Sequence, residues 1–388
     1  MVKRGVATFT LDSGQCPPWL FQRMVKLGRE ISEVLIDEYG PDEFIQRIAD
    51  PVWFQSLGTV LAFDWNASGL TTILTAALKE AIRGDEQNLG IFICGGKGKT
   101  SKKTPDEILQ WGYRLNLPKA QADQLVSNSK MSAKVDSALV QDGYQLYHHS
   151  FFFSRSGSWA VVQQGMNTEN ATARRYHWFD DSQKLDFVND PHKAISSVSV
   201  HENVLNMASK KSEKNRDLSQ ELIESGYKTL MKDIQILRQH SGAVSRMLTL
   251  KTGDEQLTLL QLDNAEFSHH ALEMEDFSKS KYLDRILQKV AYEKPESYEK
   301  LLATQGVGPK TIRALSLVGE VIYGAKPSYE DPARYSFAHG GKDATPFPVD
   351  TKTYDETIEI LGNALRKTRI NPIDKDKALK RLQTTSNI

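Results

Sequence analysis

The chain has 388 residues, of which 39% are hydrophobic and 25% are charged, a composition typical of a folded protein with two or three domains. Its 49 basic residues balance 49 acidic residues, so no overall field attracts polyanions and any nucleic-acid surface must be local. Two cysteines exclude a disulfide framework and a four-cysteine metal site. No apolar run is long enough for a signal peptide or a membrane span, so we expect a cytoplasmic protein without a membrane partner.

Helices and strands alternate in the first half of the chain. Apolar residues at helical spacing, with proline at the first position, predict helices, while β-branched and aromatic runs bounded by turn residues predict strands. Thr104 to Glu107 fit a capping box. In chain order we predict a strand at 6–11, a helix opened by Pro17 and Pro18, two further helices at about 41–49 and 70–83, a strand at 89–94, and a β-hairpin over 144–167 that turns at Ser156 and Gly157.

The composition changes near residues 205–220, where a polar and charged stretch marks a domain boundary. Beyond this boundary the predicted elements are helical. We therefore expect an α+β protein with three parts. These are a mixed domain with a small β-sheet and a nuclease site over 1–205, a helical connector over 206–270, and an all-α helix-hairpin-helix domain with a basic C-terminal helix over 271–388.

Two basic segments of the first domain are candidate nucleic-acid contacts. The loop GGKGKTSKK, residues 95–103, is not a P-loop, because the first glycine of that motif falls on Ile93. It is either a phosphate-contacting loop or a solvated one. The segment RRYHW, from Arg174 and Arg175 onward, interleaves basic and aromatic groups as single-strand-binding surfaces do. In the loop, the phosphate-contacting candidates are Lys97, Lys99, Lys102 and Lys103.

Polar side chains are dense between residues 134 and 192. Neighbouring residues on a strand point to opposite faces, so His148 and His149 cannot both serve one site without a bulge. Carboxylates and one histidine could bind a divalent cation, Mg²⁺ or Mn²⁺, which activates water against a phosphodiester. The alternative is a satisfied polar network inside the domain. The candidate metal ligands are Asp136, Asp142 and His149, and the further catalytic candidates are His148, Gln163 and Gln164.

The stretch LLATQGVGPKTIRAL, residues 301–315, has the pattern of a helix-hairpin-helix. Its two glycines permit a tight turn and a close approach of a phosphate, and the amides that open the second helix favour an anion. Such a hairpin binds the DNA backbone without reading bases. An ordinary hairpin of two helices is the alternative. The predicted contacts are Gly306, Val307, Gly308, Lys310 and Thr311.

GVGPKT, followed by PVDTKTYDETI, resembles the signature of the endonuclease III-like DNA glycosylases. The resemblance implies that Lys310 attacks the sugar C1′ to form a Schiff base and that Asp350 helps to ionise the glycosidic bond. The segment between the two motifs is longer here than in that family. The chain has no cysteine cluster, so we expect no iron–sulfur cluster.

Longer strings, among them DPVWFQSLGTVLAFDW and KVDSALVQDGYQLYHHSFFF, resemble a prokaryotic family known as domain of unknown function 763. The resemblance covers about residues 4 to 381. It suggests a protein of DNA metabolism, with a nuclease-type β-containing region followed by a helix-hairpin-helix region.

Three functions are compatible with these features. The first, which we favour, is a metal-dependent DNA endonuclease of repair or recombination type. Its DNA is held by the hairpin and by the basic segment Arg366–Arg381, which has seven basic and two acidic residues. The second is a glycosylase or abasic-site lyase that uses Lys310 and Asp350. The third is a non-enzymatic DNA-binding scaffold with a protein partner in a repair complex.

Overall fold

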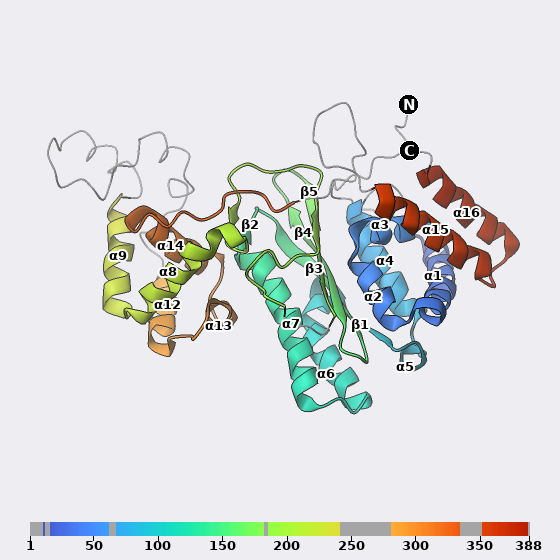
Figure 1. Ribbon diagram of the computed structural model, residues 1–388, viewed down its shortest axis with the longest axis horizontal. Helices are drawn as coiled ribbons and strands as arrows, with labels where there is room; N and C mark the ends of the chain where they lie inside the picture. The colour runs from blue at the N-terminus through green and yellow to red at the C-terminus, as the bar shows by residue number, and fades with distance from the viewer. Residues whose placement is uncertain are drawn as a thin grey trace.

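A five-stranded antiparallel sheet lies at the centre of the computed structural model (Figure 1). The structure describes residues 11, 16–61, 67–181, 185–240, 281–333 and 351–386, so the strand expected at 6–11 lies almost wholly outside the described residues. The strand order is β1 (Ile91–Lys97), β3 (Gln145–Ser154), β4 (Trp159–Asn167), β5 (Thr172–Asp180) and β6 (Ala194–Ser196), and a separate pair joins β2 (Val140–Gln141) to β7 (Leu205–Asn206).

Helices cover both faces of the sheet, which explains why its strands are apolar on both sides. Phe151 and Phe153 enter one hydrophobic core, and Phe152 between them enters the other. The predicted α+β class and the β-hairpin of β3 and β4 are confirmed. One face is covered by α1 (Pro18–Tyr39), α2 (Pro41–Ala49), α3 (Pro51–Val60) and α4 (Ala67–Ala81), followed by the short α5 (Glu86–Leu89), and the other by α6 (Thr104–Arg114) and α7 (Lys119–Ala138).

A second group of helices lies beside α7, on the left in Figure 1. The helices expected on both sides of the Gly306–Gly308 turn are present, and a π-helical turn over Val318–Ile322 follows the second. This group consists of α8 (Glu213–Glu224), α9 (Tyr227–His240), α12 (Lys281–Glu293), α13 (Tyr298–Ala303) and α14 (Pro309–Leu317).

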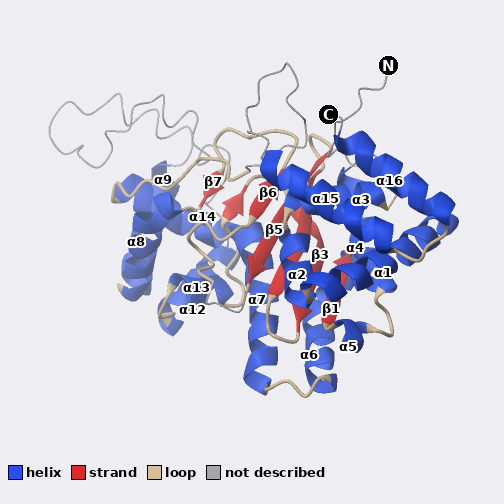
Figure 2. Ribbon diagram, turned by 45° about the vertical axis from the view of Figure 1, so that its right-hand side comes forward, coloured by secondary structure: helices blue, strands red, loops and turns tan. Residues whose placement is uncertain are grey.

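The end of the chain does not join the hairpin helices, although the sequence suggested one domain over 271–388. Helices α15 (Thr351–Lys367) and α16 (Pro372–Ser386) pack against α1 and α3, at the other end of the molecule (Figures 1 and 2). The backbone amide of Arg369 donates to Glu30 Oε2 at 2.9 Å, and Lys367 pairs with Glu38. The basic C-terminal segment is therefore far from the hairpin with which it was expected to hold DNA.

The expected capping box before α6 is wrong. No described side chain caps this helix, and Glu107 instead accepts from Lys79 Nζ at 2.6 Å and from the Gly95 amide at 2.8 Å. These contacts tie α4, the end of β1 and α6 together. No helix within the described ranges is long and apolar enough to cross a membrane.

Candidate functional site

Two rows of polar side chains cross the sheet, one on each face. They arise because doubled polar residues in β3, β4 and β5 fall in register: His148 lies opposite Gln164, and Gln164 lies opposite Arg175. Directly opposed residues of antiparallel strands share a face, so the other member of each pair points to the other side. We call the first set the α4 row, because α4 covers it, and it runs Lys97, His148, Gln164, Arg175 and Ser196.

The α4 row is matched by hydroxyl groups that recur along one side of α4. Thr75 Oγ1 lies 3.1 Å from His148 Nε2, and Gln164 donates to the Ser68 carbonyl at 3.0 Å. Arg175 donates to Thr71 Oγ1 at 3.3 Å. Residues three and four apart on a helix share a side, so a polar stripe of α4 faces a polar row of strands.

The opposite face carries what we call the Asp136 network, in which α7 is the helix partner. His149 lies 2.9 Å from Ser129 Oγ through Nε2 and 2.8 Å from Gln163 Oε1 through Nδ1. Gln163 donates in turn to Asp136. Asp136 also accepts from Trp178 Nε1 at 3.0 Å and pairs with His192. The structure thus brings together three of the predicted catalytic residues, Asp136, His149 and Gln163, and adds His192.

Asp142 belongs to a separate cluster. It accepts from Arg174 at 2.9 Å and from the Tyr176 hydroxyl at 2.7 Å. Arg174 also binds both oxygens of Asp331, at 2.8 and 2.7 Å. The three expected metal ligands therefore do not converge, and within the described part of the chain no group of three or more His, Cys, Asp or Glu residues could hold a metal ion.

Both polar rows are interior, except for the exposed Lys97 at the end of the α4 row. Arg174 and Arg175 are fully buried, so the prediction that they contact nucleic acid is wrong. Burial lowers the pKa of Arg175 to about 9 and the pKa of His148 to about 3. Burial also lowers the pKa values of His149 and, more strongly, His177, so these rings are neutral near pH 7.

The hairpin turn, in contrast, lies at the surface, and side chains from three elements bind its carbonyl groups. The carbonyl of Gln305 accepts from Lys289 at 3.0 Å, and that of Gly306 from the Tyr282 hydroxyl at 3.4 Å, both from α12. The Val307 carbonyl accepts from Lys134 of α7. The Pro309 carbonyl accepts from Gln141 of β2 at 3.0 Å. The turn therefore presents its carbonyls to the protein.

The predicted hairpin contacts divide into two groups. Lys310 is exposed and Gly306 and Gly308 are half-buried, whereas Val307 and Thr311 are buried in the helical core. Gly306 has a φ of 97°, and a Cβ atom there would lie 2.3 Å from Ile286 Cδ1, so this position requires glycine. Asp350 lies outside the described residues.

The lysine loop follows β1 at the end of the α4 row. Lys97 lies opposite His148, and residues Gly98–Lys103 form one 3₁₀ helix. Gly95 has a φ of 87°, and its Cβ position would lie 2.3 Å from the His149 carbonyl oxygen, so the loop leaves the sheet along a defined path. Contact with phosphate stays a prediction for its four exposed lysines, Lys97, Lys99, Lys102 and Lys103.

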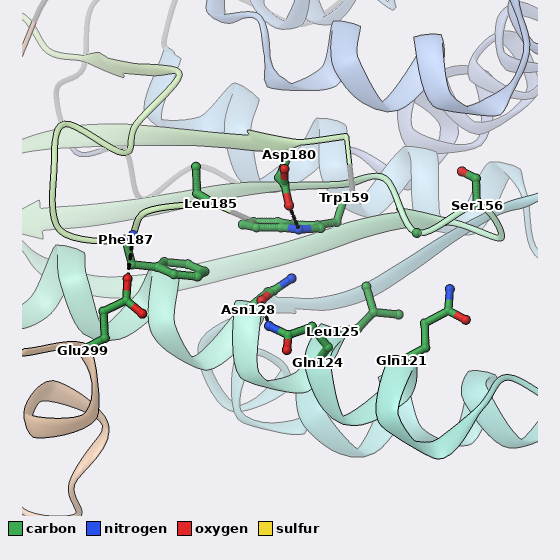
Figure 3. Close-up of a pocket in the computed structure, with 11 residues that line it drawn as sticks. Gln121, Gln124, Leu125, Asn128, Ser156, Trp159, Asp180, Leu185, Phe187 and Glu299 are labelled. Atoms are coloured by element: carbon green, nitrogen blue, oxygen red, sulfur yellow. Dashed lines mark hydrogen bonds between the residues drawn. The ribbon is translucent and has the colours of Figure 1, made fainter. Parts of the chain in front are cut away.

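A pocket of about 420 Å³ lies between the sheet, α7 and α13 (Figure 3). Trp159 and Phe187 lie above residues of α7 in this view, and Glu299 of α13 closes one end. Glu299 Oε1 accepts from the Phe187 amide at 3.1 Å. The sequence did not indicate this pocket, because its residues come from five separate segments.

Residues 5–349 match the model of a family whose description is "Protein of unknown function (DUF763)". The chain belongs to the DUF763 family. No curated protein and no solved structure matches it. The family resemblance seen in the sequence is thereby confirmed, and the DUF763 match covers both the sheet and the hairpin turn.

Replacement of Asp136 by asparagine should destabilise the protein by about 3 kcal/mol, because a buried carboxylate with three donors is lost. Urea unfolding would measure this loss. Asp123→Asn is the matched control, since Asp123 lies on the same helix in an exposed pair with Lys119, and its cost should stay within about 0.5 kcal/mol. An unchanged unfolding midpoint for Asp136→Asn would contradict the network.

Acidification should unfold the protein partly through His148. Its folded pKa of about 3 lies below the ordinary value of 6.5, so the unfolded chain binds more protons between these pH values and stability falls as pH falls. Between these pH values, His148 lowers the free energy of unfolding by about 1.4 kcal/mol for each pH unit of acidification. His148→Gln should reduce the pH slope of the unfolding free energy by that amount between pH 6 and 4. At pH 8 the slopes should coincide, and equal slopes at low pH would contradict the assignment.

Proposed function

We propose that this protein binds double-stranded DNA along its phosphate backbone. The binding surface, which we call the hairpin surface, consists of the turn at Gly306–Gly308, the first turn of α14 and one side of α12. The observation that carries this proposal is the orientation of the turn. The carbonyls of Gln305, Gly306, Val307 and Pro309 are bound by side chains, and the Val307 amide donates to the Thr304 carbonyl at 3.2 Å, so the groups left for a ligand are the amides that open α14.

The start of α14 adds to this preference. Its N-cap is Gly308, no side chain among the described residues caps it, and Lys310 stands exposed in its first turn. Uncapped amides and the helix dipole both favour an anion at such a position. A phosphate group can accept hydrogen bonds from these amides, and its negative charge is favoured by the helix dipole.

Cations continue from the turn along α12. Lys281, Arg285 and Lys289 lie four residues apart, so they share one side of the helix and are spaced by about 6 Å along its axis. Lys289 reaches the turn itself. A row of point charges beside backbone amides recognises phosphates and carries no base information, so we expect binding without sequence preference.

Cleavage of the bound DNA with Mg²⁺ or Mn²⁺ remains the prediction from the sequence. Asp136 is fully buried and engaged by three donors, so it would have to leave its network to reach a metal on DNA. For the lyase alternative, Lys310 is exposed beside the turn. The DNA-contacting role needs no such rearrangement, so we place it first.

Removal of charge from the hairpin surface should weaken DNA binding and its salt dependence. Each lost phosphate contact reduces the slope of log K against log salt by about 0.9, so Lys281→Gln, Arg285→Gln and Lys310→Gln together should reduce it by roughly 2.7. Fluorescence anisotropy with a labelled duplex between 50 and 300 mM KCl would measure this, with unrelated sequences giving equal affinities.

The matched control is a triple variant at the other end of the molecule. Arg369, Lys377 and Lys380 are exposed cations near or on α16, and glutamine in their place removes the same charge. This variant should retain the wild-type salt slope. Equal losses in both triples would indicate unspecific attraction, and a loss confined to the control would refute the hairpin surface.

A nicking assay tests the chemistry separately. Supercoiled plasmid is incubated with Mg²⁺ or Mn²⁺ and then with EDTA. If the sequence-based prediction holds, nicking requires the metal, survives Lys310→Ala and is abolished by His149→Ala. Borohydride trapping on an abasic duplex that Lys310→Ala abolishes would instead indicate the lyase. DNA binding without either reaction would leave the scaffold role.

A further inference from the structure

The pocket of Figure 3 has a composition that selects the charge of its ligand. Carboxamides of Gln121, Gln124 and Asn128 line it from α7, and carboxylates of Asp180 and Glu299 line it from β5 and α13. None of its lining residues is lysine, arginine or histidine. A phosphate or carboxylate group is therefore disfavoured inside it, and N–H donors are favoured.

Apart from Ser156, the remaining lining is apolar, with Leu125 from the α7 side and Leu185 and Phe187 from the loop after β5. Its volume of about 420 Å³ is that of a small-molecule site. Apolar walls with carboxamides suit a flat heterocycle, because a carboxamide both donates and accepts hydrogen bonds. Gln124 Nε2 donates to Asn128 Oδ1 at 2.8 Å, and an aliphatic amine or guanidinium, which offers donors only, would leave the other carboxamide N–H groups without an acceptor from the ligand.

Glu299 adds a directed acceptor. Its Oε1 is held by the Phe187 amide at 3.1 Å, which fixes the carboxylate at the pocket. The second oxygen, Oε2, has no partner among the described residues. A carboxylate placed in this way accepts from an amino or ring N–H group on the edge of a base.

Two helices connect this pocket to the hairpin surface. Helix α13 places Glu299 of its first turn at the pocket and leads into the Gly306 turn, and its six residues span about 9 Å. On α7, Asn128 lines the pocket and Lys134 binds the turn, again about 9 Å apart. Three stacked base pairs rise about 10 Å, so a base near the phosphate held at the turn lies within reach.

We propose that this pocket binds a nucleobase through its amino-bearing edge, with the phosphate groups outside. The base belongs either to a free nucleoside or to a nucleotide displaced from DNA that is held at the hairpin surface. The second source rests on the proposed DNA binding, whereas the first does not.

The test uses the full-length protein and two probes. Free guanosine, adenosine, cytidine and uridine are titrated by calorimetry, with guanosine 5′-monophosphate expected to bind no better than guanosine. A duplex with 2-aminopurine, whose fluorescence rises when the base leaves the stack, is titrated in parallel with anisotropy to record DNA binding itself.

Two variants remove the contacts to the base, and one serves as a control. Glu299→Gln keeps an acceptor for the Phe187 amide but removes the charge, and Gln124→Ala removes an exposed carboxamide from α7. Glu299→Gln should weaken base binding at least about tenfold, because a hydrogen bond to a charged group is lost, and Gln124→Ala should weaken it by roughly threefold to tenfold, because the lost partner is neutral. Asp123→Ala, on the same helix and outside the pocket lining, should bind as the wild type does.

Nucleoside binding that these variants weaken supports the pocket with a free ligand, and a 2-aminopurine signal that they abolish supports a displaced base. Nucleoside binding without duplex binding would leave the pocket assigned and refute the DNA proposal. The pocket proposal is overturned if no nucleoside binds and the 2-aminopurine fluorescence does not rise, even when anisotropy shows that the duplex binds. It is also overturned if both variants give the same response as the wild type.

Discussion

The register of the antiparallel sheet is the constraint on which the rest of this structure depends. Because His148 lies opposite Gln164 and Gln164 lies opposite Arg175, one member of each doubled polar pair joins the same row. A shift of one residue would move every side chain to the other face and carry Phe152 out of its core. Each row in turn requires a polar stripe on the helix that covers it. The buried sides of α4 and α7 therefore carry hydroxyl and carboxylate groups where an ordinary core helix carries aliphatic ones.

Helix α7 transmits this constraint to the rest of the molecule. Asp136 anchors it to the sheet, Lys134 binds the hairpin turn and Asn128 lines the pocket, all within three turns of one helix. Burial lowers the pKa of Lys134, yet its ammonium group still donates to the Val307 carbonyl. The direction in which the turn presents its amides is thus set partly by residues of the sheet domain. Arg174, between Asp142 and Asp331, joins the two halves of the chain a second time.

Much of the fold could be predicted from the sequence, whereas the setting of the polar residues could not. Local spacing indicated α1, α2, β3, β4 and the helices around the hairpin turn, and alternation correctly separated His148 from His149. Composition cannot reveal that Arg174 is buried, because its partner Asp331 lies 157 residues away in the chain. Glu107 was wrongly assigned to a capping box for the same reason, because its carboxylate accepts a hydrogen bond from Lys79 of another helix. The pocket is built by residues from five segments, and no local pattern marks them.

If the protein binds DNA as proposed, the difference between the Asp136 network and the hairpin turn decides which of them contacts the DNA first. A residue such as Asp136 can bind a metal or a substrate only after Gln163, Trp178 and His192 give up their acceptor, and each buried donor left without a partner costs about 1–3 kcal/mol. The hairpin turn has no such cost, because its carbonyls are bound from within and the amides that open α14 have no side-chain cap. Contact with a phosphate backbone therefore requires no change in the fold, whereas chemistry in the Asp136 network requires several kcal/mol of rearrangement. DNA bound at the turn is a source from which that energy could come, since phosphate contacts supply a large share of the affinity of DNA-binding proteins.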